Sequence, residues 1–76
     1  MSNYEPIHCT QFDYVEDFIT RKVYGTIIYK KDNDAHTIQD QLVDWENENG
    51  TEYAITKSGL KIRMDKIVKL FDKEFK

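Results

Sequence analysis

Apolar residues follow a helical spacing near the start of the chain and an alternating spacing over most of the rest. Within residues 11–21, three apolar side chains fall on one stripe at 100° per residue, as in a helix that docks on a core. The positions of that stripe are Phe12, Val15 and Ile19. Thr10 is the predicted N-cap, where it accepts the backbone N–H of Asp13. The pattern predicts one short amphipathic helix.

The alternation after this helix predicts β-strands separated by polar turns. The predicted strands are residues 23–30, 35–45, 51–56, 60–64 and 67–71. The predicted turns are residues 31–34, 46–50 and 57–59, and the charged tail, residues 72–76, is expected to fray. Five consecutive, strongly bent strands favour a small antiparallel barrel, because closure removes exposed edges. The fold class is therefore predicted as mainly β, with one N-terminal helix capping a five-stranded barrel.

The predicted helix carries more acids and aromatics than docking on a core requires. Asp13, Glu16 and Asp17 occupy the face next to the apolar stripe. Tyr14 and Phe18, four residues apart, lie side by side on the flank opposite the stripe, so both are expected to be exposed. We interpret this surface as a candidate binding site for a partner, with the acids as charged contacts and the aromatics as anchors.

Length and composition limit the class of protein. A chain of 76 residues forms one domain, residues 1–76, with a small core. The single cysteine, Cys9, cannot form an internal disulfide, which is typical of a reducing compartment. The first residues lack the features of a signal peptide, and apolar runs fall short of the ~20 residues that a membrane span needs. We expect a cytoplasmic protein that does not contact membranes.

Charge is distributed unevenly along the chain, although the net charge is only −3. Residues 1–56 contain eleven acids and four bases, whereas residues 57–76 contain seven bases and three acids. Such an asymmetry can orient a protein towards a charged partner and accelerate their encounter at low salt. The simpler interpretation is that these charges only solvate the surface.

Catalytic and metal-binding patterns are not evident in the sequence. His8 and Cys9 are neighbours, but zinc needs three or four ligands, and His36 stands alone on a predicted strand. Cys9 is expected to be a small buried hydrophobic residue and His8 a surface residue. The three glycines are separated along the chain and do not form a phosphate-binding loop. We predict no enzyme activity, metal or cofactor.

RNA binding is the main alternative to protein binding for a small β-barrel. Lys61 and Arg63 share one face of a predicted strand, and Lys57 and Lys66 are close in sequence. The isoelectric point near 5.2 argues against this function, because nucleic-acid-binding domains are usually basic. Direct nucleic-acid binding is therefore not expected.

Several sequence blocks resemble the Rho-binding antiterminator (Rof) family, which are small bacterial inhibitors of the transcription termination factor Rho. The block YEPIHC at residues 4–9, followed by Phe12, Asp13 and Glu16, is similar to the family's opening Y-x-P-I-x-C-x-x-[YF]-D-x-x-E pattern. Three later blocks are similar to its D-L-V, E-Y and L-R-L-D-K-I segments, the first with a one-residue insertion. They are DQLV at residues 40–43, EY at residues 52–53 and IRMDKI at residues 62–67.

The resemblance implies an Sm-like barrel with an N-terminal helix that binds Rho near its primary RNA-binding site and prevents RNA loading. It places the acidic contacts on Asp13 and Glu16 and an aromatic contact on Phe12, which the helical spacing also assigns to the core. It places a loop contribution on residues 46–50, for which the candidates are Asn47, Glu48 and Asn49. The resulting hypothesis is a monomeric, non-enzymatic inhibitor of Rho that causes antitermination. The alternative is an Sm-like RNA-binding subunit that assembles into a ring.

Overall fold

The computed structural model describes residues 6–76 and contains one helix followed by a β-sheet, which confirms the mainly β class. Tyr4 and Glu5, the first residues of the YEPIHC block, lie outside the described residues. The helix α1 spans Cys9–Arg21, and the short 3-10 helix η1 spans Met64–Lys66. The strands are β1 (Tyr24–Lys31), β2 (Asp34–Glu48), β3 (Thr51–Thr56), β4 (Lys61–Arg63), β5 (Ile67–Leu70) and β6 (Lys73–Glu74).

The strands form one antiparallel sheet in the order β4-β3-β2-β1-β5-β6. The sheet is not closed, since β4 and β6 are its two edges, so the predicted five-stranded barrel is not confirmed. After the three-residue strand β4, η1 redirects the chain, and β5 pairs with β1 instead of β4. In the described part of the chain, the gap between β4 and β5 therefore remains unpaired.

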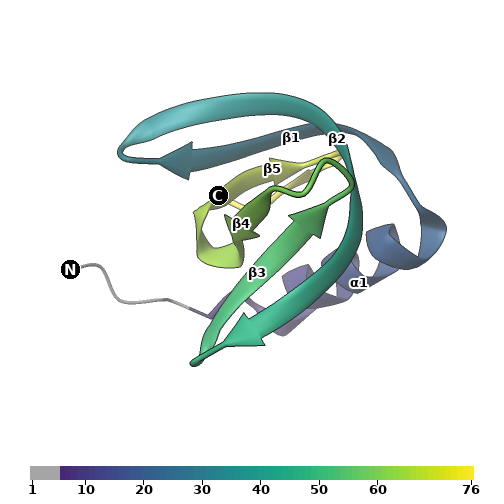
Figure 1. The fold of residues 1–76 in the computed structure, drawn as a ribbon, viewed down its shortest axis with the longest axis horizontal. Coiled ribbons are helices and arrows are strands. Elements are labelled where there is room, and N and C mark those ends of the chain that lie inside the picture. The colour runs from purple at the N-terminus through teal and green to yellow at the C-terminus, as the bar shows by residue number, and fades with distance from the viewer. Residues whose placement is uncertain (1–5) are drawn as a thin grey trace.

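Strand β2 connects the two halves of the sheet. It pairs with β1 as far as Gln41 and with β3 from Leu42 onwards, with an irregularity between Leu42 and Asp44. Its strong curvature places the first half beside β1 and the second half beside β3 (Figure 1). The turns at its two ends are tighter than predicted. Each is formed by two residues with positive φ, which is the geometry of short hairpins. They are Asp32 and Asn33 (53° and 69°), and Asn49 and Gly50 (55° and 88°).

The helix docks through a wider apolar stripe than the sequence spacing predicts. Val15 and Phe18 are 0% and 2% exposed, whereas Phe12 and Ile19 are only half-buried at the margins of the stripe. The Phe18 ring packs edge-to-face on Phe71, with the ring centroids 4.8 Å apart. The prediction that Phe18 is exposed is wrong, because it follows Val15 by three residues and so shares its face.

The start of α1 also differs from the prediction. The helix begins at Cys9 with His8 as its N-cap residue, so Thr10 lies within the helix and is not the N-cap. The Gln11 side chain accepts a hydrogen bond from the His8 backbone N–H at 3.3 Å, which satisfies one of the free amides at the helix start. Asp13 consequently lies beyond the first helical turn, which contains no acid.

The C-terminal tail is ordered, which contradicts the expected fraying. Lys73 and Glu74 form β6 against β5, and Phe75 is 7% exposed within the core cluster. The Phe75 backbone N–H donates to the carbonyl of Val68 at 2.8 Å. The Gln11 amide donates to the carbonyl of Phe75 at 2.9 Å, so the tail also holds the start of α1.

Candidate functional site

The acidic face of α1 is present as predicted. Asp13, Glu16 and Asp17 are all exposed. Asp17 forms an ion pair with Arg21, one helical turn later, at 2.8 Å. The carboxylates of Asp13 and Glu16 form no ion pair with any described residue. Asp13 and Glu16 therefore provide the available negative charge on this helix.

Phe12 connects this helix to the sheet. Its ring packs edge-to-face against Trp45 of β2, with the centroids 4.8 Å apart and the planes at 82°. Both side chains are half-buried, so this contact anchors α1 while leaving part of each ring accessible. Trp45 was not among the residues predicted from the sequence. The available signal was a lone tryptophan between two acids, Asp44 and Glu46.

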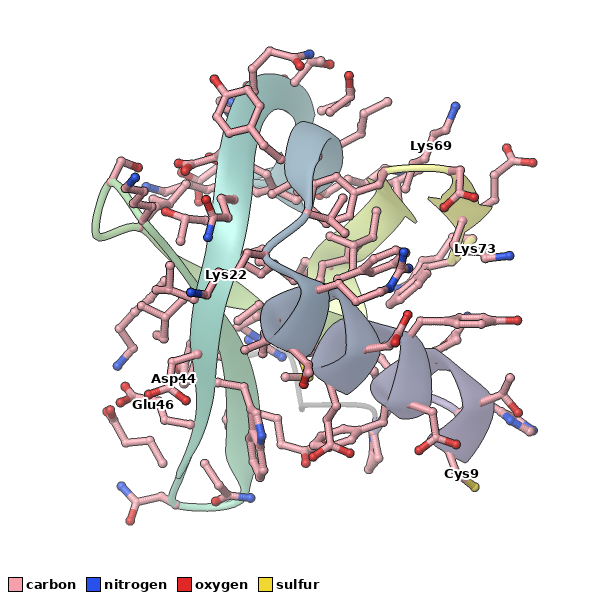
Figure 2. All side chains as sticks on the ribbon, turned by 90° about the vertical axis from the view of Figure 1, so that its right-hand side faces the viewer. Cys9, Lys22, Asp44, Glu46, Lys69 and Lys73 are labelled. Atoms are coloured by element: carbon pink, nitrogen blue, oxygen red, sulfur yellow. The ribbon has the colours of Figure 1, made fainter. Side chains whose placement is uncertain are left out.

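Alternating positions on β2 carry Asp44, Glu46 and Glu48. Because Trp45 faces α1, these neighbours project from the other side of the strand. Figure 2 shows Asp44 and Glu46 together, pointing away from the helix. Asp44 accepts a hydrogen bond from the backbone N–H of Trp45 at 2.8 Å. This bond satisfies a backbone donor in the part of β2 that is not paired with β1, since that pairing ends at Gln41. The acids of β2 and those of α1 therefore lie on different faces.

Lys61 of β4 compensates two of these acids. Its Nζ lies 2.8 Å from Glu46 Oε1 and 2.7 Å from Glu48 Oε2. The same ammonium lies 4.5 Å from the ring centroid of Tyr53, on the strand between them. Hydrogen bonds to Glu46 and Glu48 raise the pKa of Lys61 above its ordinary value. Lys61 therefore stays charged and holds both carboxylates on the sheet.

The hairpin residues predicted to contact a partner have structural roles here. The loop over residues 46–50 is replaced by a β2 strand that continues to Glu48 and a turn at Asn49 and Gly50. Asn47 Oδ1 accepts the backbone N–H of Gly50 at 3.0 Å, and Asn49 adopts φ 55°. Of the three candidates, Glu48 is an exposed charge, and it is paired with Lys61.

The two aromatic anchors predicted on α1 do not lie together on an exposed flank. Tyr14 is half-buried against the core, and the Lys73 ammonium lies 5.0 Å from its ring centroid. Phe18 is buried and offers no surface to a partner. The aromatics of α1 and its surroundings that keep accessible surface are Tyr24, which is 67% exposed, and the half-buried Tyr14, Phe12 and Trp45.

A buried carboxylate supports the turn between β3 and β4. Asp40 is 8% exposed and accepts hydrogen bonds from Ser58 Oγ at 2.5 Å and from the Gln41 backbone at 2.7 Å. Thr56 Oγ1 lies 3.0 Å from Ser58 Oγ and accepts the backbone N–H of Leu60. Burial raises the pKa of Asp40, but the hydrogen bonds from Ser58, Gln41 and Thr56 outweigh it and hold that pKa below its usual value. This network of hydrogen bonds stabilises the turn between β3 and β4.

The remaining chemical candidates are separated from one another. Cys9 is exposed at the first helical residue, so the expectation that it is buried is wrong. His36 stacks on Tyr29, with the rings 5.4 Å apart and 21° from parallel. Among residues 6–76, no group of three or more His, Cys, Asp or Glu side chains is arranged to hold a metal ion. No helix in this part of the chain is long and apolar enough to cross a membrane.

Comparison with known proteins provides no relative. No family model matches the chain, and no curated protein or solved structure is significantly similar to it. The resemblance to the Rho-binding antiterminators therefore rests on the sequence blocks described above.

Proposed function

We propose that this chain is a non-enzymatic, cytoplasmic inhibitor of the transcription termination factor Rho. In this proposal, the acidic face of α1 binds the basic surface near the primary RNA-binding site of Rho. RNA loading is then blocked, and terminators are read through. The observation that carries the proposal is the state of Asp13 and Glu16, which are exposed and unpaired within residues 6–76.

Unpaired carboxylates suit a partner surface that binds phosphates. Lysine and arginine side chains that hold an RNA backbone can accept carboxylates instead, and long-range attraction accelerates their encounter. Exposed ion pairs contribute only about 0.2–1 kcal/mol each, so stable binding also needs apolar contact. The half-exposed rings of Phe12, Tyr14 and Trp45 are available for that contact.

The Sm-like barrel implied by the resemblance remains part of this proposal. A strongly curved β2 shared by two half-sheets supports such an architecture, with an opening between β4 and β5. We expect the free protein to be monomeric. A ring-sized mass in size-exclusion chromatography with light scattering would instead favour the alternative function, an Sm-like RNA-binding subunit.

The test is a charge reversal on α1. We expect the Asp13→Lys/Glu16→Lys variant to lose co-purification with Rho, with an affinity lowered about tenfold or more, because attraction becomes repulsion. The measurement is biolayer interferometry against purified Rho at two salt concentrations, with far-UV circular dichroism to verify folding.

The matched control is Asp32→Lys/Asp34→Lys, which makes the same charge change at exposed acids in and beside the turn between β1 and β2. We expect this control variant to keep binding Rho. Its association rate should fall slightly, because two fewer acids weaken the long-range attraction to the basic surface of Rho. Equal affinities of the α1 variant and the wild-type protein would refute the proposed surface.

A further inference from the structure

A groove lined mainly by basic residues lies on the sheet, and no residue of α1 is among its lining residues. A cavity of about 500 Å³ is bordered by the turn between β1 and β2, by β3 and β4, and by η1. Its basic lining residues are Lys30, Lys31, Lys61, Arg63 and Lys66, and its one acidic lining residue among the described residues is Asp32. A neighbouring cavity of about 510 Å³ shares Lys30, Asn33 and Lys66 with it and adds Val68 and Lys76. The two cavities are therefore neighbours, with Lys30 and Lys66 between them.

Much of the positive charge in the groove is uncompensated. Arg63 is held by Asp65 through two hydrogen bonds of 3.0 and 2.7 Å, and Lys61 is held by the β2 acids. Lys30, Lys31 and Lys66 form no ion pair within the described residues. Like charges gathered around a concave surface repel one another, and a bound anion relieves that repulsion.

Two aromatic rings accompany these lysines. Tyr29 and Tyr53 both line the first cavity, from β1 and β3. One face of the Tyr29 ring is covered by the stacked ring of His36, and one face of the Tyr53 ring by the Lys61 ammonium, so a base can stack only on the opposite face of each ring. Cationic side chains along a track with interspersed aromatic faces are the combination by which proteins hold single-stranded nucleic acid.

We infer that this groove binds single-stranded nucleic acid, with phosphates along the free lysines and bases against the tyrosines. This goes beyond inhibition of Rho, which uses α1. The paired cavities favour a strand with repeated phosphates over a single small anion. A strand with unpaired bases also presents faces that can stack on a tyrosine, whereas a duplex does not. Salt screens the attraction between lysines and phosphates, so binding is strongest at low salt. The net charge of −3, in view of which direct nucleic-acid binding was not expected from the sequence, opposes this attraction.

The first test removes charge from the groove. We expect fluorescence anisotropy with a labelled twelve-nucleotide oligouridylate to report binding at low salt. The Lys30→Gln/Lys66→Gln variant should bind about tenfold more weakly, and its log–log salt slope should be smaller by ~1.4, or about 0.7 for each lost phosphate contact. The matched control is Lys57→Gln/Lys69→Gln, which removes two lysines outside the groove lining. It should stay within about twofold of the wild-type affinity.

The second test separates base stacking from attraction to any polyanion. The Tyr53→Leu variant keeps apolar bulk but loses the ring, and we expect it to weaken oligonucleotide binding about tenfold while leaving tripolyphosphate binding unchanged. Amide chemical shifts that move at Lys31, Tyr53 and Lys66, but not along α1, would support the assignment. Absence of binding at low salt, equal losses in the groove and control variants, or insensitivity of oligonucleotide binding to Tyr53→Leu would overturn it.

Discussion

At the scale of single residues, the carboxylate of Asp40 shows how a buried charge is retained in a small core. Hydrogen bonds favour the ionised form more than burial disfavours it, so the folded-state pKa lies below that of an unfolded chain. The ionised group therefore stabilises the fold at neutral pH. This contribution is lost as the pH falls below about 4, through the folded-state pKa.

Removing the Ser58 hydroxyl tests this interpretation. We expect Ser58→Ala to lower the free energy of unfolding by about 1.5–3 kcal/mol at pH 7, as for other hydrogen bonds to charged groups. The loss should be smaller at pH 3 than at pH 7, because the hydrogen bond from Ser58 favours the ionised form of Asp40, and this advantage is lost as the carboxylate becomes protonated. Urea unfolding at the two pH values measures both quantities.

Thr20→Ala is the control, since its hydroxyl donates to a backbone carbonyl on the exposed face of α1. Its effect on the free energy of unfolding should be equal at the two pH values. A Ser58→Ala effect that is likewise independent of pH would contradict the proposed role of the ionised carboxylate.

At the scale of secondary-structure elements, the C-terminal segment is part of the core. Phe75 is 7% exposed, and the neighbouring backbone pairs with β5 and with Gln11 of α1. We expect Phe75→Ala to cost about 3–5 kcal/mol, the usual cost of truncating a buried phenylalanine. Thermal unfolding followed by circular dichroism measures this loss.

The exposed neighbour Lys76 supplies the control for this prediction. Lys76→Ala should change the free energy of unfolding by no more than about 0.5 kcal/mol, as is common for surface substitutions. Equal stabilities of Phe75→Ala and Lys76→Ala would show that the tail does not stabilise the fold.

The same elements show which parts of the fold could be predicted from the sequence. Local alternation of apolar and polar residues was sufficient for the strands before Phe71, and Asn49 with Gly50 marked a hairpin turn. Burial of Phe75 could not be predicted, because it is one apolar residue among four charged neighbours. Its place in the core depends on the pairing of β6 with β5 and on the contact with Gln11 of α1. The open sheet depends on how η1 redirects the chain, which no periodicity encodes.

The residues of the candidate sites also divide into those that local spacing predicts and those that depend on distant contacts. Exposure of Asp13 and Glu16 was predictable from helical spacing. The burial of Phe18 was predictable as well, because it follows Val15 by three residues on the helix. The contact of Phe18 with Phe71 and the pairing of Glu48 with Lys61 depend on segments that are distant in the sequence. Such contacts are set by tertiary structure.

At the scale of the whole molecule, charge is divided by surface and not by position along the chain. Lys30 and Lys31 come from the acid-rich first part of the sequence, yet they line the same groove as Arg63 and Lys66. The acids of α1 remain apart from this groove. A chain with a net charge of −3 therefore presents a basic surface as well as an acidic one.

Lys61 lines the basic groove and, on the face of the sheet away from α1, holds Glu46 and Glu48 of β2. Replacing it should therefore affect the interaction proposed for the groove and not the one proposed for α1. We expect Lys61→Met to weaken oligonucleotide binding, because the released carboxylates then repel phosphates beside the groove. Rho binding should stay within about twofold of the wild-type affinity, because the proposed contact lies on α1 and exposed charges elsewhere contribute little. Fluorescence anisotropy measures the affinity for the oligonucleotide, and biolayer interferometry measures the affinity for Rho, both on the same protein sample. Lys57→Met, which makes the same change in net charge outside the groove lining, is the control. If Lys61→Met weakened both interactions, Lys61 would instead be needed to maintain the sheet that supports them.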